Sequence, residues 1–329
     1  MNTDKQKFLI EVSKLYYYDN LQQEEIARLY YSSRSTISRA LDAARREGLV
    51  RIIIPEVGFD PRELEAQLRK TFNLSHVHVV PVNQSDDLIN LQLTARSSAQ
   101  FISQFIKPDD RIGLAWGSTL FELVRNLPSL SMPNLQIVQL IGNIDSAVVQ
   151  SYAMNIVETA SMHLGTTNAY TVMCPVMTES SLIRDILLHD SRINQVLSLG
   201  ANCNKMFINL APPTPESCLF RSGYMTTKEI ENLRQNETVG SICCHFIDDN
   251  GDLSYPELDR RTIGVSLEDI ERSDMVIACV SDPRKVKILH ASLLKGYINV
   301  LMIDSISAKR LLEFHDMRLQ STALRKKKA

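Results

Sequence analysis

Two kinds of hydrophobic spacing divide the chain. Between residues 8 and 44, apolar side chains recur every three or four positions, which is the period of an amphipathic helix. Beyond residue 73, short uninterrupted apolar runs alternate with longer helical patterns, as in chains that build a parallel sheet covered by helices. The pattern predicts a small all-α unit at the N-terminus and a larger α/β unit with a mostly parallel sheet.

The N-terminal pattern predicts three short helices. Only about three residues, 31–33, separate the second helix from the third, so the two must meet in a tight angular turn. Three helices with such a turn form a helix-turn-helix unit, and the apolar run 48–54 has the pattern of a short wing strand. The apolar stripes consist of Phe8, Val12, Leu15 and Tyr16, of Ile26, Ala27 and Tyr30, and of Ile37, Ala40, Leu41 and Ala44.

The polar face of the third helix carries hydroxyl and guanidinium groups. Residues 33–46 contain four arginines and a single acid, Asp42. Arginine can bridge two acceptors of guanine, and serine or threonine hydroxyls can reach base edges or phosphates. An ordinary solvated helix face is the alternative interpretation. The candidate DNA-binding residues are Ser33, Arg34, Ser35, Thr36, Ser38, Arg39, Arg45, Arg46 and, on the wing, Arg51.

The expected sheet strands are the apolar runs 76–82, 111–117, 135–142, 205–211, 274–281 and 299–305, and helical patterns cover 62–74, 87–106, 150–164, 180–199 and 283–295. In such sheets, ligands bind at the carboxyl ends of the strands. Ser118 and Thr119 begin a helix just after one strand, where hydroxyls and free N–H groups can hold an anion. A plain helix cap is the alternative. Other polar residues of these loops are Gly142, Asn143, Arg221 and Lys285, with Asp248 or Asp304 as acceptors for sugar hydroxyls.

Composition and charge narrow the class of protein. The 329 residues are 44% hydrophobic, enough for two domains with cores, and no apolar run is long enough to cross a bilayer. We expect a cytoplasmic protein with no membrane partner. Residues 1–54 contain nine basic and seven acidic residues, a net charge of +2. Because the whole chain has a net charge of −2, the remaining residues carry −4. A basic head on an acidic body does not fit a protein that coats nucleic acid over its whole surface.

The cysteines and histidines give no sign of a metal or cofactor. The six cysteines lack any CxxC pair, and His76 and His78 have no evident third ligand. Cys243 and Cys244 are interpreted as strand neighbours that point to opposite faces, which argues against a redox pair. We expect reduced core cysteines, no metal and no cofactor.

The stretch "QQEEIARLYYSSRSTISRALDAARREGLVRI" resembles the helix-turn-helix of the SorC family of sugar-responsive bacterial transcription regulators. The motifs "WGST", "FRSGY", "VGSICCHFID", "RTIG" and "KGYINVLMID" follow in the order of that family. The resemblance implies a domain similar to ribose-phosphate isomerase and glucosamine-phosphate deaminase that binds a sugar phosphate. Its pocket would be lined by Ser118, Thr119, Gly142, Asn143, Arg221, Asp248 and Lys285.

The chain departs from the family pattern at several glycines. Tyr31 and Ser32 stand where the family has a glycine and an apolar residue in the turn, and Asn143, Val280–Ser281 and Leu210–Ala211 replace glycines of the ligand loops. Backbone approaches phosphate most closely at glycine. These losses motivate the hypothesis of an altered effector, such as an unphosphorylated sugar or alditol.

Two functions are open. The first is a regulator that binds double-stranded operator DNA as a dimer or tetramer and is controlled by a sugar, sugar alcohol or sugar phosphate. The alternative is a sugar-phosphate isomerase or deaminase with a DNA-binding head, for which Asp248, Asp304 and His290 are the candidate acids and bases. No compact motif joins these three, so we expect a regulator and not an enzyme. The expected domains are a DNA-binding unit (1–54), a linker and pairing helix (55–72), an effector-binding domain (73–315) and a basic tail (316–329), within which we expect residues 325–328 to be disordered.

Overall fold

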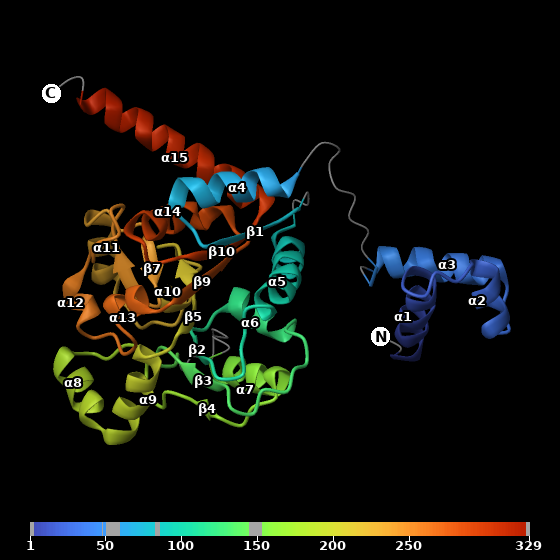
Figure 1. Ribbon diagram of the computed structural model, residues 1–329, viewed down its shortest axis with the longest axis horizontal. Coiled ribbons are helices and arrows are strands. Elements are labelled where there is room, and N and C mark those ends of the chain that lie inside the picture. Colours follow the sequence, from blue (N-terminus) through green and yellow to red (C-terminus); the bar gives the residue numbers. More distant parts are fainter. Residues whose placement is uncertain (1–2, 48, 51–59, 83–85, 145–152, 327–329) are drawn as a thin grey trace. The chain divides into compact units, whose positions relative to one another are not determined.

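A computed structural model of the protein describes residues 3–47, 49–50, 60–82, 86–144 and 153–326 (Figure 1). The chain divides into two compact units, residues 1–56 and residues 57–329, and each is considered by itself. In the described part of the chain, we find no helix with the length and apolar character needed to span a membrane.

The first unit is a three-helix bundle. It consists of α1 (Thr3–Tyr17), α2 (Gln23–Leu29) and α3 (Arg34–Arg46). The predicted stripes meet in one small core, in which Val12, Ile26, Ile37 and Ala44 are fully buried. Ser33 caps α3, because its hydroxyl accepts a hydrogen bond of 3.2 Å from the Thr36 N–H. The three helices and their sharp turn are as predicted, whereas the predicted wing and Arg51 lie outside the described residues.

Tyr31 adopts an unusual backbone conformation in the turn between α2 and α3. Its φ is +47°, in the left-handed region that favours glycine. The side chain is fully exposed to solvent, so no packing within the described unit offsets this strain. The turn keeps the geometry that glycine would give it, with a tyrosine in its place.

The second unit is built on a seven-stranded sheet in the order β1-β10-β9-β5-β2-β3-β4, and all neighbouring strands are parallel. Because helices cover both faces, its central strands are buried along almost their whole length and are apolar apart from Lys205 at the start of β5 and Asp304 at the end of β10. This burial explains the long apolar runs in the sequence. The strands are β1 (His76–Val80), β2 (Arg111–Leu114), β3 (Gln136–Gln139), β4 (Ala169–Tyr170), β5 (Lys205–Ile208), β9 (Met275–Val280) and β10 (Val300–Asp304). The mostly parallel α/β fold is confirmed.

Helices surround this sheet (Figure 1). The predicted helix 180–199 is two helices, because Asp190 ends α8 and its carboxylate caps the first N–H groups of α9. Arg325 and Lys326, for which we expect disorder, belong to α15, which continues to Lys326, whereas Lys327 and Lys328 lie outside the described residues. The helices are α4 (Pro61–Phe72), α5 (Asp87–Ser103), α6 (Ser118–Arg125), α7 (Ala153–Leu164), α8 (Ser181–His189), α9 (Ser191–Ala201), α10 (Cys218–Arg221), α11 (Thr227–Gln235), α12 (Pro256–Asp259), α13 (Leu267–Arg272), the 3-10 turn η1 (Pro283–Lys285), α14 (Val286–Lys295) and α15 (Ser305–Lys326).

A second, antiparallel sheet has the order β6-β7-β8, with β6 (Leu210–Ala211), β7 (Gly240–Ile242) and β8 (His245–Ile247). Cys243 and Cys244 form the two-residue turn between β7 and β8, with φ of +47° and +71°. Two positive φ values are the signature of the tight hairpin turn that matches strand twist. The interpretation of the two cysteines as strand neighbours is therefore wrong. Both side chains are buried.

Candidate functional site

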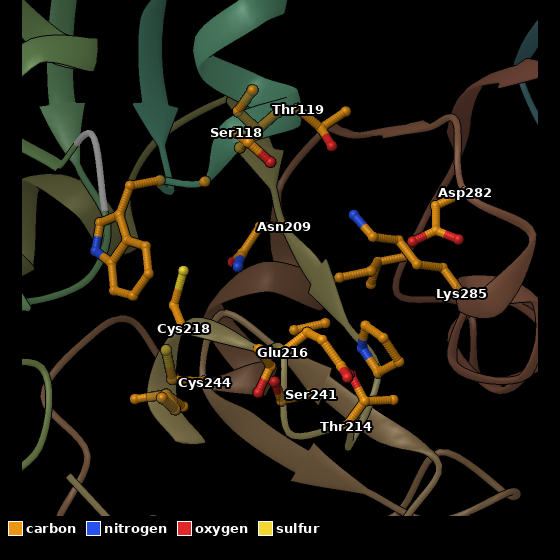
Figure 2. Close-up of a pocket in the computed structure, with 18 of the residues that line it drawn as sticks. Ser118, Thr119, Asn209, Thr214, Glu216, Cys218, Ser241, Cys244, Asp282 and Lys285 are labelled. Carbon is orange, nitrogen blue, oxygen red and sulfur yellow. The ribbon is translucent and has the colours of Figure 1, made fainter. Parts of the chain in front are cut away.

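A pocket opens at the carboxyl ends of β2, β5 and β9 (Figure 2). Its cavity has a volume of about 190 Å³. Its walls come from the start of α6, the segment from β5 to β6, the loop before α10, the β7–β8 hairpin and the residues after β9. The pocket therefore lies at the edge of the sheet where open α/β folds bind their ligands.

The start of α6 supplies N–H groups to the pocket. Gly117, with a φ of +146°, turns the chain from β2 into α6, and no side chain caps the helix. The first N–H groups of a helix have no partner within it and carry the positive end of its dipole. Ser118 and Thr119 add two hydroxyls at the same wall. This corner of the pocket suits an anion.

Lys285 enters the same pocket from η1, and Figure 2 shows its ammonium directed toward the space between Asn209 and the start of α6. Among the described residues it forms no hydrogen bond or ion pair, although its side chain is half-buried. Burial lowers the pKa of Lys285, and the nearby Asp282 carboxylate opposes this. An ammonium without an ion pair in a partly desolvated pocket can take an anionic ligand as its direct partner.

Asp282 is engaged by its own loop. Its carboxylate accepts hydrogen bonds from the Arg284 N–H at 2.9 Å and from Arg284 Nε at 3.0 Å. Burial acts to raise the pKa of Asp282, but the bonds from Arg284 outweigh it and the pKa is lowered. Asp282 is therefore occupied as the cap of η1. Arg284 also lines the pocket but is paired with Asp282, which leaves Lys285 as the lining cation without an ion pair among the described residues.

Several pocket residues were not found from the sequence. Asn209 lies in the middle of the site in Figure 2, and its Oδ1 is buried without a hydrogen-bond partner among the described residues. Ser241 and Cys244 come from the small antiparallel sheet and Glu216 from the loop before α10. The Thr214 hydroxyl lowers the pKa of Glu216. The one sequence signal is a polar residue, Asn209, within the apolar run 205–211.

The structure places the predicted effector residues in two groups. Ser118, Thr119 and Lys285 line the pocket, whereas Gly142, Asn143, Arg221 and Asp248 do not.

The second group has other local roles. The Gly142 carbonyl accepts a hydrogen bond of 2.7 Å from the Trp116 indole, and a Cβ at Gly142 would lie 2.5 Å from a backbone oxygen. Asn143 donates to the Val172 carbonyl at 2.6 Å, Asp248 accepts from two N–H groups of its own turn, and Arg221 is exposed at the end of α10.

The candidate acids and bases of the enzyme alternative are dispersed. Asp304 caps α15 by accepting from the N–H groups of Ile306 and Ser307, both at 2.8 Å. His290 lies between α14 and α15, with its Nε2 3.1 Å from Nδ1 of His315. Neither residue lines the pocket, and Asp248 does not either. The geometry does not aim these three predicted groups at one reacting carbon.

In the first unit, α3 presents the predicted contact residues on one face. Arg34, Ser35, Thr36, Arg39, Arg45 and Arg46 are exposed, and Ser38 is half-buried. Arg45 pairs with Asp42 at 2.7 Å and Arg34 lies 3.7 Å from Glu24. Among the described residues, Arg39 and Arg46 form no ion pair, so they are the arginines freest to contact an external anion such as DNA phosphate.

Comparison with known proteins agrees with this geometry. Residues 58–313 match the family model "Putative sugar-binding domain". The deoxyribonucleoside regulator of Bacillus subtilis (strain 168) is 28% identical over 312 residues, which cover 95% of this chain and 99% of the relative. The sorbitol operon regulator of Klebsiella pneumoniae is 25% identical over 95% of this chain and 99% of its own.

A solved structure shows the same fold. The full-length sorbitol operon regulator SorC from Klebsiella pneumoniae superposes with a TM-score of 0.70 at 24% identity, over 94% of this chain and 100% of that one. The chain therefore belongs to this family of sugar-binding domains and, with its helix-turn-helix unit, to the SorC-type transcriptional regulators.

Proposed function

We propose that the protein is a DNA-binding transcriptional regulator of a carbohydrate operon, controlled by a small effector in the pocket of the second unit. Its relatives are named as regulators of deoxyribonucleoside and sorbitol genes, which supports the class of effector. The DNA-binding part is residues 1–54, and the effector-binding domain is residues 73–315. The pairing helix in residues 55–72 corresponds to α4.

The effector that fits the pocket best is a sugar phosphate. The observation that carries this proposal is the convergence of the uncapped start of α6 and the unpaired Lys285 ammonium on one cavity. A phosphate would accept hydrogen bonds from the N–H and hydroxyl groups of Ser118 and Thr119 and would supply the counter-charge for Lys285. An unphosphorylated sugar or alditol, suggested by the missing glycines, would leave that charge unpaired.

The DNA partner is double-stranded operator DNA. The N-terminal turn of α3 carries Arg34, Ser35, Thr36 and Arg39, which we assign to the major groove, and Arg46 to a backbone phosphate. One helix-turn-helix unit contacts too little DNA for high specificity, so the active form is a dimer or tetramer that places two heads on a palindromic site.

Binding without turnover is the proposed role of the pocket. The dispersal of Asp248, Asp304 and His290 supports a sensor over an isomerase or deaminase.

The first experiment is fluorescence anisotropy with a labelled duplex from the upstream region of the gene. The protein–DNA complex is titrated with sugars, sugar alcohols and their phosphates. Release or tightening by a sugar phosphate, with no response to its parent sugar, supports the proposal. A response to the parent sugar alone would restore the unphosphorylated effector, and chemical turnover of a sugar phosphate would favour the enzyme.

A further inference from the structure

Asn209 is a polar side chain at the centre of the pocket that neither the family comparison nor the sequence pattern assigns to a role. It follows β5 directly, and its Cβ lies 3.9 Å from the position that a Cβ on Gly117 would occupy. The Asn209 amide is therefore next to the start of α6, across the cavity from the walls that bear Ser241 and Glu216 (Figure 2).

The backbone of Asn209 is held by the hairpin on the far wall. Its carbonyl accepts a hydrogen bond of 3.2 Å from the Cys243 N–H. That N–H belongs to the tight turn in which Cys243 and Cys244 both have positive φ. The turn between β7 and β8 thus fixes where the Asn209 side chain enters the pocket.

The side chain itself lacks the partner that burial normally demands. Asn209 Oδ1 is buried and accepts no hydrogen bond from any described residue. An unpaired buried acceptor costs free energy, and such groups in native proteins are usually satisfied by a ligand or by water. A phosphate dianion only accepts hydrogen bonds, so it cannot satisfy this oxygen, whereas a hydroxyl group can.

We propose that Asn209 is a specificity-determining residue that accepts a hydrogen bond from an effector hydroxyl beside the anion corner formed by α6 and Lys285. The inference rests on the proposed function and deepens it. The site then selects molecules that carry an anionic group and a hydroxyl within a few bonds of it, and it discriminates against anions of similar size that lack hydroxyls. Asn209 reads the hydroxyl while α6 and Lys285 read the charge.

The test uses calorimetry on the full-length protein. The probes are ribose 5-phosphate, glucose 6-phosphate and sorbitol 6-phosphate as polyol phosphates, propyl phosphate as an anion without a free hydroxyl, and inorganic phosphate. Weak probes are measured by competition. The variant Asn209→Leu keeps the size of the side chain and removes its polar atoms, and Asn236→Ala, at an exposed helix end, is the matched control.

Asn209→Leu should weaken the best polyol phosphate about tenfold, which is what one buried hydrogen bond contributes, and should change propyl phosphate and inorganic phosphate less than twofold. Its melting temperature without ligand should not fall, because the variant removes an unsatisfied acceptor. Asn236→Ala should match the wild type in all of these measurements.

Other results overturn the proposal in separable ways. Unchanged polyol-phosphate binding by Asn209→Leu, or an equal loss for every probe, would refute the role of Asn209 and leave the proposed effector class intact. A lower melting temperature of the variant would show a structural role instead. If the wild type bound none of the phosphates, the proposed effector class would fail first, and this inference with it.

Discussion

At the scale of single residues, two neighbouring lysines differ in whether they face the pocket. Lys285 and Lys287 are two positions apart, but Lys285 faces the pocket while Lys287 is exposed on α14. Lys285→Met should weaken binding of a phosphorylated effector by about 10- to 100-fold, since hydrogen bonds to charged groups contribute about 1.5–3 kcal/mol. Lys287→Met is the control and should bind like the wild type. Calorimetry of both variants checks this.

The two lysine variants also test the cost of burial. Burial lowers the pKa of Lys285, because its charge is partly desolvated and forms no ion pair among the described residues. Lys285→Met should therefore raise the melting temperature of the ligand-free protein while it weakens effector binding. Equal melting temperatures for Lys285→Met and Lys287→Met, together with unchanged effector affinity, would remove Lys285 from the site.

The arginines of α3 make a second comparison at this scale. Arg39 lies in the part of the helix assigned to base edges, and Arg46 ends the helix, where a phosphate contact is expected. Arg39→Ala should reduce discrimination between operator and mutated operator by about 1–3 kcal/mol. Arg46→Ala should weaken both duplexes alike and lower the salt dependence of binding. Competition anisotropy on the two duplexes decides, and uniform loss in both variants contradicts the assignment.

Tyr31 allows a stability test that separates the two units. Tyr31→Gly relieves the strain of a positive φ at an exposed position and should stabilise the first unit by about 0.5–1 kcal/mol, after the entropy cost of glycine. The single tryptophan, Trp116, is buried in the second unit. In denaturant titrations, tryptophan fluorescence should therefore report an unchanged transition while circular dichroism reports the shift. A shift in both signals would show that the effect is not local.

At the scale of elements, the buried parallel strands were predictable because each is a continuous apolar run bounded by polar residues. The same runs hid their boundaries: the run 205–211 is two strands, β5 and β6, which belong to different sheets. Pattern reasoning recognises burial, but it cannot tell which partner a strand pairs with. The pattern predicts one helix over 180–199 and no division at Asp190, because α8 and α9 follow one another without a break in hydrophobic periodicity.

The antiparallel hairpin shows why half of the pocket escaped sequence reasoning. Tight hairpin turns are normally marked by Asn-Gly or Asp-Gly, and here the turn is Cys243–Cys244. Without the turn signal, β7 and β8 were not seen as a hairpin, so Ser241 and Cys244 were not placed at the ligand. Ser118 and Lys285 were found because they directly follow strands of the main sheet. Convergence of distant loops is set by tertiary packing, which the local pattern does not encode.

The contact between α14 and α15 makes the second unit sensitive to acid. Burial lowers the pKa of His290 to about 4, and the charges of His315 and Arg318 act in the same direction while Asp249 opposes them. The folded state therefore holds His290 neutral down to about pH 4, whereas the unfolded chain binds the proton near pH 6.5. The stability that the protein gains from keeping His290 neutral is complete above about pH 6.5 and is lost as the pH falls toward 4.

Replacement of His290 tests this linkage. In His290→Gln, the melting temperature should depend less steeply on pH between about 6.5 and 4 than in the wild type. His189→Gln, on the exposed side of α8, is the control and should keep the wild-type slope. Equal slopes in all three proteins would mean that the acid sensitivity comes from other groups.

At the scale of the whole molecule, the sign of the net charge differs between the helix-turn-helix part and the rest of the chain. Residues 1–54 carry a balance of +2 and the remainder −4, so attraction to DNA is concentrated in the first unit and the body of the protein is repelled. The nine arginines and lysines of residues 1–54 are dispersed along the sequence: only Arg45 and Arg46 are adjacent, and no cluster of basic residues could hold DNA by charge alone. Affinity should thus depend on docking α3 in register, which two linked heads achieve better than one.

The proposed coupling between effector binding and operator binding makes a prediction that involves both sites. If the effector changes operator affinity by some factor, thermodynamic linkage requires operator DNA to change effector affinity by the same factor. Both factors are measurable on the wild type, by anisotropy of labelled DNA with and without effector and by calorimetry of the effector with and without DNA. Lys285→Met should reduce operator release at a given effector concentration, because less effector is bound, while its operator affinity without effector stays that of the wild type.

Arg39→Ala supplies the reverse control. Its effector affinity in the absence of DNA should equal that of the wild type, since α3 belongs to the other compact unit. Its operator affinity should fall whether or not effector is present. If the two coupling factors of the wild type disagreed beyond error, binding would not be a closed equilibrium, and a change of oligomeric state with concentration would have to be included. If both factors equalled one, the protein would bind DNA and sugar phosphate independently, and the pocket would not control the operator.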